Sequence, residues 1–263
     1  MKRKTRRDLL ATGGSLLSLG LAGCSTFRSP TLPSGEYPQG TSKSGIEDRE
    51  QLLSATRKAL RNNAYDITRK NHPITAQYRS SPSAKRQVRT IRGPNQPIEM
   101  FFEDGIAYVK IGPDGESKYG KWTYDRSFDR IHGSSSRMTV DILGGSLTTT
   151  NAIAQLDGPQ SLDSILDVGN FQPAKATELN GRPVLKFALQ SVDQKKVDED
   201  ASKTDGSLYI DAQGVVHEAS LRVETTSNGT TNIKDINSVR INSLSVSAIP
   251  EPSWIKKQFQ SSS

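Results

Sequence analysis

The single cysteine of this 263-residue chain, Cys24, is the residue whose chemistry is easiest to define. One thiol cannot form a disulfide within the chain, so a lone cysteine is a candidate for covalent modification or for a reactive nucleophile. Cys24 follows Leu21-Ala22-Gly23, whose small residues before the thiol leave the peptide bond open to a peptidase. The pattern favours a cysteine that becomes the first residue of a cleaved chain and carries an attached group.

The 23 residues before Cys24 have the composition of an export signal. Basic residues are followed by an apolar stretch that is too short and too rich in glycine to anchor the chain stably. Arg6 and Arg7 lie in Thr5-Arg6-Arg7-Asp8-Leu9-Leu10, which matches the twin-arginine pattern, an address for proteins that are exported already folded. The segment that ends at Cys24 resembles the lipobox of prokaryotic lipoproteins, and residues 1–24 together resemble the leaders of haloarchaeal lipoproteins.

These motifs predict where the chain is processed and where it resides. We expect residues 1–23 to be a twin-arginine signal peptide and Cys24 to carry a diacylglycerol. Each buried methylene of an acyl chain contributes about 0.8 kcal/mol to membrane binding, so the lipid would anchor the protein far better than the leader could. The expected location is the extracytoplasmic face of the cell membrane, with the membrane itself as a partner through the lipid on Cys24.

The net charge of +7 overstates how basic the mature chain is, because the leader holds five of the 35 basic residues and one of the 28 acidic residues. Elsewhere basic and acidic residues are interleaved, apart from the stretch that contains Lys85, Arg86, Arg89 and Arg92. This stretch indicates either a contact with anionic lipid head groups or polymers, or a solvated strand face, and we expect the solvated face. We predict no nucleic-acid partner, since that function needs clustered basic residues.

Two segments imitate ligand-binding loops without the residues that the chemistry requires. Residues 115–121 have the two glycines and the lysine of a phosphate loop, but Trp122 stands where Mg²⁺ needs a Ser or Thr hydroxyl. Asp198, Asp200 and Asp205 suggest a calcium loop, but the glycine at 206 is too late for the turn that such a loop makes.

The three histidines, His72, His132 and His217, do not lie at metal-ligand spacing from one another or from the cysteine. His217 alternates with apolar residues, so we interpret it as a hydrogen-bonded histidine within a sheet. No Gly-x-Ser-x-Gly nucleophile motif occurs. We therefore predict no enzymatic activity, no metal and no cofactor.

The rest of the chain predicts one α+β domain. Residues 24–45 are rich in Pro, Ser and Gly, which is typical of a flexible spacer. Residues 46–62 have helical spacing, and from Tyr65 onward the pattern changes to the two-residue period of strands, interrupted by a short helix after Ser161. We expect a domain over residues 46–255, with an antiparallel sheet of about nine to eleven strands and two or three helices, and a disordered tail over residues 256–263.

The order of these elements resembles the LolA/LppX/LprG type of lipoprotein carrier. The resemblance rests on the hairpin Gly206-Ser207-Leu208-Tyr209-Ile210-Asp211 and Gly214-Val215-Val216-His217-Glu218-Ala219, on Asp104–Val109 and on the Pro252-Ser253-Trp254 ending. It implies a curved antiparallel half-barrel with helices on its concave side that encloses an apolar cavity for a lipid or acyl chain.

Apolar residues that alternate along three strands are the candidates for lining such a cavity. They are Leu185, Phe187, Leu189, Leu208, Ile210, Leu221 and Val223. Two interpretations stay open: these side chains bind a hydrophobic, lipid-like ligand, or they form an ordinary core and the protein is a structural lipoprotein whose partner is another envelope protein. Asn228, in Asn228-Gly229-Thr230, is a glycosylation candidate in a predicted turn.

Overall fold

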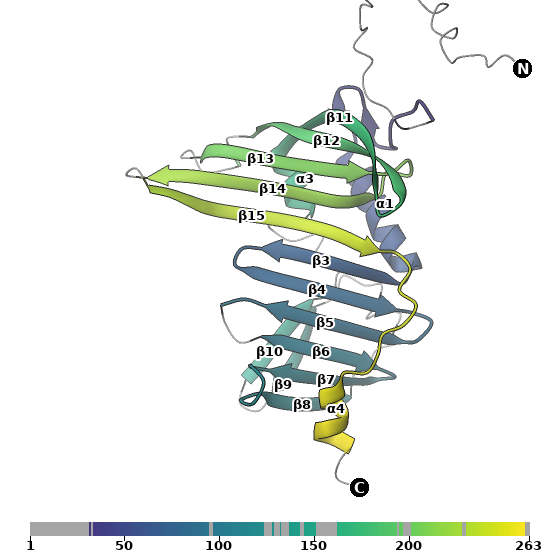
Figure 1. The fold of residues 1–263 in the computed structure, drawn as a ribbon, viewed down its shortest axis with the longest axis vertical. Coiled ribbons are helices and arrows are strands. Elements are labelled where there is room, and N and C mark those ends of the chain that lie inside the picture. Colours follow the sequence, from purple (N-terminus) through teal and green to yellow (C-terminus); the bar gives the residue numbers. More distant parts are fainter. Residues whose placement is uncertain are drawn as a thin grey trace, which may run out of the picture.

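The computed structural model describes residues 32, 34–94, 97–123, 128, 132, 137–142, 145–150, 162–193, 195–196, 201–227 and 230–260. Its main feature is an open antiparallel sheet of eleven strands, which confirms the predicted α+β half-barrel (Figure 1). In their order across the sheet, the strands are β11 (Gly169–Leu179), β12 (Arg182–Val192), β13 (Ala201–Ile210), β14 (Val216–Ser227), β15 (Thr230–Ser243), β3 (Tyr65–Asn71), β4 (Ile74–Ser81), β5 (Arg86–Arg92), β6 (Ile98–Glu103), β7 (Ile106–Ile111) and β8 (Lys118–Thr123).

The remaining described elements are short. The helices are α1 (Arg49–Asn62), α3 (Leu162–Val168) and α4 (Ser253–Ile255), which continues as the π-helical turn η2 (Lys256–Gln260). Two separate two-stranded sheets are formed by β1 (Thr41–Ser42) with β2 (Gly45–Ile46) and by β9 (Arg137–Ile142) with β10 (Gly145–Thr150).

The chain builds the sheet from its middle outward. Strands β3 to β8 follow one another to one edge, β11 then begins at the opposite edge, and β11 to β15 return to the centre. The last strand, β15, therefore pairs with the first long strand, β3, with Ile241 opposite Ile67. Every other contact between neighbouring strands of this sheet is a hairpin, which explains why the sequence shows a turn signal between most strands.

Two of these hairpins turn at two successive residues with positive φ. Asp104 and Gly105 have φ of 44° and 79°, and Asn180 and Gly181 have φ of 53° and 74°. Two successive left-handed residues give the tight turn whose twist matches that of the flanking strands, and Asn-Gly and Asp-Gly adopt it with least strain. Asp104-Gly105 therefore closes the hairpin of β6 and β7, and Asn180-Gly181 closes the hairpin of β11 and β12.

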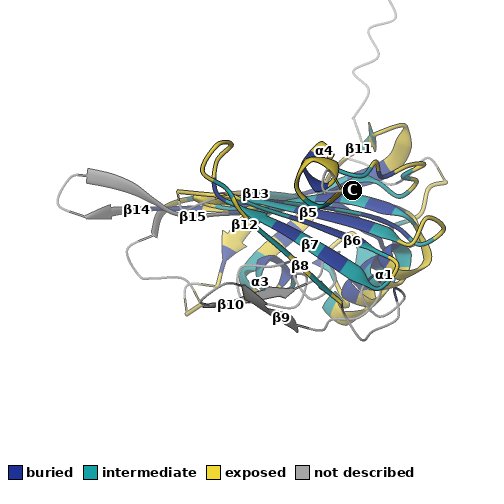
Figure 2. Cartoon of the chain, turned by 90° about the horizontal axis from the view of Figure 1, so that it is seen from below, coloured by how far each residue is buried: buried dark blue, intermediate teal, exposed yellow. Residues whose placement is uncertain are grey.

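The sheet has an inner face, which α1 and α3 cover, and an outer face, where α4 lies (Figure 2). Helix α1 starts at Arg49 because the side chain of Asp48 accepts a hydrogen bond from the backbone N–H of Gln51 at 2.9 Å and caps the helix. The helix therefore begins three residues later than the predicted residue 46. Its buried side, which includes Leu52, Leu53 and Leu60, packs into the largest apolar cluster of the protein.

Within the described part of the chain, three apolar clusters hold these layers together. The main cluster joins α1 and α3 to the inner face of β3, β4 and β11 to β15. The inner cluster, on the same face of β6 and β7, contains Met100, Phe102, Ala107 and Val109. The outer cluster, on the opposite face, contains Val88, Phe101, Ile249, Trp254 and Ile255.

Both predicted ends of the domain differ in the structure. Leu32 and Pro38 are buried, and β2 contacts β11, so the predicted spacer of residues 24–45 is shorter than its composition indicated. Residues 256–260, predicted to be part of a disordered tail, form η2, and Phe259 packs against Tyr108 with ring centroids 5.4 Å apart. Burial of these few apolar side chains outweighs the polar composition of both segments.

Candidate ligand-binding face

The register of the sheet brings the predicted lining residues together on the inner face. Leu185 lies opposite Ile210, and Phe187 lies opposite Leu208. On the next strand pair, Leu221 and Val223 lie opposite Gly206 and Thr204. Directly opposed residues of antiparallel strands point to the same side, so the candidates of β12, β13 and β14 form one surface.

This surface is buried against the helices. Leu185, Phe187, Leu208 and Ile210 have no exposed surface, and Leu221 and Val223 are 5% exposed. These six residues belong to the main cluster with residues of α1 and α3, and the seventh, Leu189, is partly buried and packs against it. Either a core or a ligand-lined face gives this arrangement, so the lining function of these residues remains a prediction.

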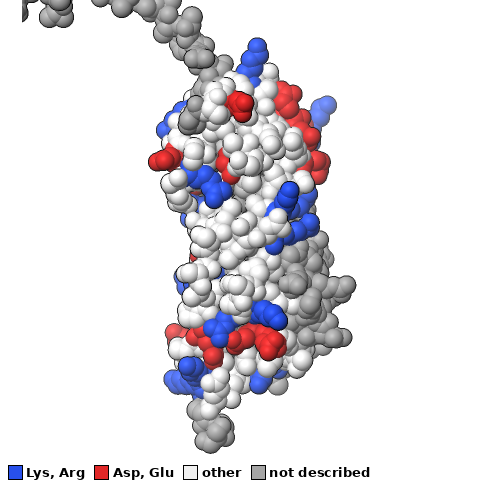
Figure 3. Space-filling model, turned by 90° about the vertical axis from the view of Figure 1, so that its right-hand side faces the viewer, with Lys and Arg blue, Asp and Glu red and all other residues white. Residues whose placement is uncertain are grey.

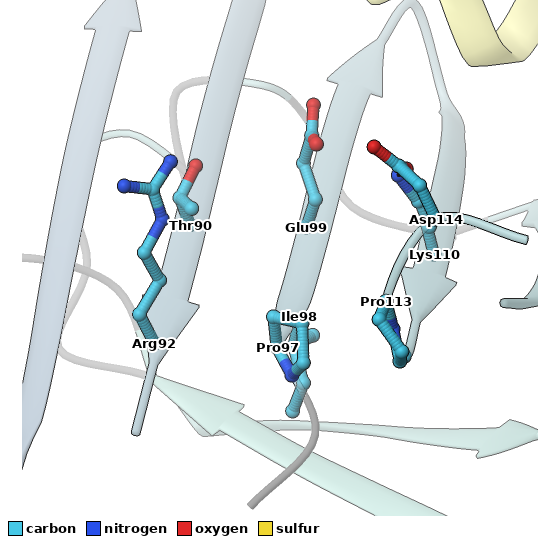
Figure 4. A pocket seen from close by; sticks show the side chains of 9 residues that line it. Thr90, Arg92, Pro97, Ile98, Glu99, Lys110, Pro113 and Asp114 are labelled. Atoms are coloured by element: carbon cyan, nitrogen blue, oxygen red, sulfur yellow. The ribbon is translucent and has the colours of Figure 1, made fainter. Parts of the chain in front are cut away.

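Three pockets bordered by described residues lie elsewhere, and none of the seven predicted residues borders them. A pocket of about 590 Å³ follows α1, between Ser54, Lys58 and the turn at Gln213. A pocket of about 320 Å³ lies near the ends of β5, β6 and β7 (Figure 4). Charged side chains of both signs, among them Arg92, Glu99 and Lys110, line the latter, which is not the chemistry of an apolar site.

Gly214, in the turn beside the larger pocket, could not be another residue. Its φ is +79°, and a Cβ atom built there would lie 2.7 Å from the backbone oxygen of Gln39. The backbone N–H of Gln39 in turn donates to the carbonyl of Ala212, with N and O 3.3 Å apart. The close approach fixes the segment before β1 against the turn between β13 and β14.

A band of polar side chains crosses the inner face beside the main cluster. It consists of Tyr65 and Arg69 on β3, Tyr78 on β4, and Gln87 and Arg89 on β5. Tyr78 lies opposite Arg89, which lies opposite Met100. The band therefore lies at the edge of the main cluster, to which Tyr65 and Tyr78 belong, where it borders the inner cluster.

Arg89 is the largest fully buried side chain of the described residues, with 2% exposure. Its Nε donates to Oε1 of Gln87 at 2.8 Å, and its guanidinium lies 4.5 Å from the centre of the Phe102 ring. Burial lowers the pKa of Arg89 to about 10, although the hydroxyls of Tyr65 and Tyr78 oppose this shift. We predicted a solvated strand face for the basic stretch at 85–92, and this prediction is wrong for Arg89.

Tyr65 connects the band to α1 through His132. The Nε2 of Gln87 donates to the hydroxyl of Tyr65 at 3.2 Å, and the rings of Tyr65 and His132 stack with centroids 5.0 Å apart. His132 is 3% exposed, and its two ring nitrogens lie 2.8 Å from Oγ of Ser80 and 3.2 Å from the carbonyl oxygen of Arg61. Burial raises the pKa of Tyr65 to about 12, so the phenol stays neutral.

A second buried polar group fixes the hairpin between β13 and β14. Oδ1 of Asp211 accepts the backbone N–H groups of Gln213 and Val215 at 3.0 and 3.1 Å, and Oδ2 accepts Nε2–H of His217 at 2.8 Å. Burial alone would raise the pKa of Asp211, but the hydrogen bond and charge of His217, with the bonds from Val215 and Arg182, lower it. His217 is the hydrogen-bonded sheet histidine that we predicted.

Other predicted features are placed as follows. Residues 115–121 form the turn before β8 and its first residues, and the ammonium of Lys121 lies 5.6 Å from the ring centre of Tyr108, so no helix begins there to bind phosphate. Within the described ranges, no three His, Cys, Asp or Glu residues gather as a metal site. Cys24, Arg6, Arg7 and Asn228 lie outside the described residues.

The surface of the described part mixes both charges. On the side shown in Figure 3, Lys and Arg lie beside Asp and Glu in small groups separated by uncharged surface. On the outer face of the sheet, Arg240 lies 3.4 Å from Glu218, and Arg222 lies 2.6 Å from Glu224. Of the helices described, none is long and apolar enough to cross a membrane.

Comparisons with known proteins found similar solved structures at low sequence identity. LprF from Mycobacterium bovis is 12% identical, with 80% of this chain and 99% of that chain covered and a TM-score of 0.37. The lipoprotein LppX of Mycobacterium tuberculosis is 12% identical over 72% of this chain and 92% of that one, with a TM-score of 0.32. A putative outer membrane lipoprotein-sorting protein domain from Vibrio parahaemolyticus is 12% identical, with 79% of this chain and 97% of that chain covered and a TM-score of 0.14.

No family model matches the chain, and a search of curated proteins found no match. LppX and a lipoprotein-sorting domain stand among the similar solved structures, as the resemblance in the sequence indicated. These identities and TM-scores are too low for a conclusion about function, which therefore rests on the residues of this chain.

Proposed function

We propose that this chain is a membrane-anchored extracytoplasmic lipoprotein whose half-barrel binds a hydrophobic, lipid-like ligand on its inner face. We infer ligand binding from one observation. The inner sides of β12, β13 and β14 form a single apolar surface directly under α1 and α3. Contacts between apolar side chains have no fixed direction, so helices that rest on such a surface can move away from it and admit an acyl chain.

The anchor in this proposal is the lipid on Cys24. The twin-arginine signal that contains Arg6 and Arg7 directs the chain to export. Leu32 is already buried in the main cluster, so seven residues, or eight Cα-to-Cα steps, separate it from the anchor. An extended chain spans at most about 3.5 Å per residue, which limits this link to roughly 28 Å. The β11 edge of the sheet, which β2 contacts, would therefore lie close to the membrane surface.

The anchor is tested by fractionating cells that express Cys24→Ser. We expect the parent chain in the membrane fraction and the variant in the soluble fraction or the medium, because the acyl chains supply the membrane affinity. Replacing Arg6 and Arg7 together by lysine is the matched test of export, and it should leave an unprocessed chain inside the cell. A Cys24→Ser chain that stays with the membrane as firmly as the parent would contradict the anchor.

The ligand is tested by extracting the purified protein with organic solvent and identifying lipids by mass spectrometry. We expect at least one class of lipid in near-stoichiometric amount. Phe187→Asp places a charge on the buried surface and should abolish lipid retention, whereas Lys186→Asp, on the outer side of the same strand, should not. Circular dichroism shows whether each variant is folded. A folded Phe187→Asp protein that retains its lipid would contradict the proposed lining.

A second candidate is a structural lipoprotein that binds another envelope protein and has a solid core. It is favoured by the complete burial of Leu185, Phe187, Leu208 and Ile210 and by the position of the three pockets away from them. The extraction experiment separates the two functions. A folded parent protein that carries no lipid and takes up none would replace the first proposal by this one.

A further inference from the structure

We propose that a crevice at the start of β12 and β14 and the end of β15 binds a small oxyanion between the side chains of Arg182 and His217. The crevice has a volume of about 130 Å³, and none of the seven predicted lining residues borders it. The proposal goes beyond the function proposed above, because it neither requires nor excludes a lipid on the inner face.

The turn between β11 and β12 forms one wall of this crevice. Nδ2 of Asn180, in that turn, donates to the carbonyl oxygen of Asn242 near the end of β15, with N and O 3.0 Å apart. Arg182, the first residue of β12, follows directly, and its Nη1 lies 3.3 Å from Nε2 of His217 on β14. Strands β12 and β14 are not neighbours in the sheet, so this contact places two distant positively ionisable side chains at one crevice.

Asp211 holds these two side chains together. Its Oδ2 accepts hydrogen bonds from Nε2 of His217 at 2.8 Å and from Nη1 of Arg182 at 3.3 Å. Its Oδ1 accepts two backbone N–H groups, and its side chain is only 3% exposed. The carboxylate is thus fully engaged and does not border the crevice. When His217 is protonated, two positive charges and one negative charge give the group a net positive charge.

Both side chains keep nitrogens that Asp211 does not use. Because an ionised carboxylate only accepts hydrogen bonds, Nε2 of His217 carries the hydrogen that binds Asp211, and Nδ1 remains. Among the described residues, neither this Nδ1 nor Nε and Nη2 of Arg182 has a hydrogen-bond partner. Protonation turns Nδ1 into a donor, and a guanidinium beside an imidazolium suits the oxygens of a sulfate, a phosphate or a carboxylate.

The dimensions of the crevice restrict the ligand to a few atoms. A water molecule takes up about 30 Å³ in the liquid, so the crevice holds the volume of roughly four waters. This suits a tetrahedral oxyanion or a short carboxylate and is too small for a lipid. Ser243 also borders the crevice. Its Oγ accepts the backbone N–H of Ser245 at 3.0 Å, and its own hydrogen can be donated to the ion.

The acidic side chains on neighbouring strands are engaged elsewhere. Asp66 on β3 accepts hydrogen bonds from the amides of Gln77 and Asn242, and Glu218 on β14 lies 3.4 Å from Nε of Arg240. Neither carboxylate borders the crevice. Of the described residues that border it, His217 is the one that changes charge between about pH 5 and 8. We therefore expect an anion to bind more tightly when His217 is protonated.

The test follows the ring C–H signals of the histidines by NMR in the mature chain with Cys24→Ser, at constant ionic strength. Sulfate and acetate are the probes, because both keep a constant charge from about pH 5.5 to about pH 8, where histidine titrates. The chain has three histidines, so the signal that disappears in His217→Gln belongs to His217. Sulfate against acetate distinguishes a tetrahedral ion from a carboxylate.

At the lower pH, we expect one or both probes to shift the signal of His217 in a saturable way and to leave those of His72 and His132 unchanged. At the higher pH the affinity should be about tenfold or more weaker, since a hydrogen bond to a charged group contributes that much. His217→Gln keeps a nitrogen donor for Asp211 but carries no ionisable group. Calorimetry should therefore show weak binding to this variant at both pH values.

Arg182→Met should weaken binding about tenfold or more at the lower pH, because it removes the forked donor. Arg222→Met is the matched control. Arg222 is 46% exposed against 43% for Arg182, and it also pairs with a carboxylate, that of Glu224, but it does not border the crevice. Its loss should leave the affinity within about twofold of the parent. Thermal unfolding of each variant shows that the comparison is made between folded proteins.

Three results would overturn the anion site. They are the absence of a saturable shift of the His217 signal with both probes, equal affinity of the parent at the two pH values, and unchanged affinity in a folded Arg182→Met protein. The first two are measured on the parent chain, so they decide the question even if a variant does not fold. None of these measurements depends on lipid retention, so the anion site and the proposed function stand or fall separately.

Discussion

Strands β11 to β15 carry their apolar side chains on the inner face, under α1 and α3, whereas strands β5 to β7 carry them on both faces. The outer face of the first region bears charge pairs such as Arg240 with Glu218. The outer face of the second is covered by residues 244–260, here called the strap, which places Ile249, Trp254 and Ile255 against Val88 and Phe101.

The difference indicates which part of the sheet can open. In the first region, the described residues that cover the inner face belong mainly to the two helices α1 and α3, and separating these helices from the sheet exposes the apolar surface beneath them. In the second region, apolar burial on both faces restrains the strands from two sides. A ligand that enters between a helix and the sheet meets less resistance in the first region, which is where the predicted lining residues lie.

Truncating the centre of the main cluster should have the largest effect on stability. Phe187→Ala removes a fully buried ring from the inner face of β12, and such changes cost about 3–5 kcal/mol. We expect a lower free energy of unfolding in urea, with the whole protein unfolding in one transition. A cost below about 1 kcal/mol would mean that the site already contains a cavity, which is what a ligand-lined face without its ligand would show.

Truncating the strap should have a smaller and more local effect. Trp254 is 8% exposed, and its indole Nε1 has no hydrogen-bond partner among the described residues. Trp254→Ala should detach the strap before the sheet unfolds, so the global cost stays below the ~3–5 kcal/mol of a fully buried Trp. Hydrogen exchange should become faster in residues 244–260 and at Tyr119 and Phe101. Equal acceleration in α1 would contradict the independence of the two regions.

The buried carboxylate of Asp211 predicts a pH dependence of stability in the first region. Its pKa is lower in the folded protein than in the unfolded chain, where an Asp titrates near about 3.9. The ionised Asp211 therefore contributes to the free energy of unfolding at pH values above the unfolded pKa. This contribution is lost as the pH falls through the pKa of the folded protein. Asp211→Asn should cost about 1–3 kcal/mol at pH 7 and should weaken the decrease in melting temperature below about pH 4.

Asp114 in the second region is the matched control for this titration. The hydrogen bond and charge of Lys110 lower its pKa as well, but its carboxylate is exposed at the surface. Exposed ion pairs contribute little because water and salt screen them. We expect Asp114→Asn to leave both the melting temperature and its pH dependence unchanged, and a change as large as that of Asp211→Asn would contradict the assignment of the effect to burial.

The sequence predicted the features that depend on neighbouring residues. The turns at Asp104-Gly105 and Asn180-Gly181, a helix within residues 46–62 and the alternation of Leu185 with Phe187 can each be identified from a short stretch of sequence. Their combination predicted one α+β domain and the seven apolar residues that share strand faces, whereas the half-barrel followed from the resemblance. Periodicity cannot show whether such a face is filled by helices or by a ligand, so the predicted cavity followed from the resemblance alone.

The features that were missed depend on contacts between distant segments. On β5, Arg86 and Arg92 share one face with Val88, while Arg89 shares the other with Ile91. Both faces mix charged and apolar residues, so the alternation alone does not decide which is inner. The strap was missed because its contacts are long-range. Trp254 and Phe259 pack against side chains on strands more than 130 residues earlier in the chain.

The smallest loss of stability that we predict tests whether α1 is held by its own cap or by the main cluster. Asp48→Ala removes the side chain that accepts the N–H of Gln51, a change that costs about 1 kcal/mol. If the main cluster dominates, the helix stays on the sheet, and hydrogen exchange increases in the first turn at Arg49 to Gln51 but not at Leu60. Asp48→Asn, which keeps an acceptor oxygen, should restore most of the loss. If exchange increases along the whole of α1, the helix is released by the loss of one hydrogen bond, and the first region then opens far more easily than its packing indicates.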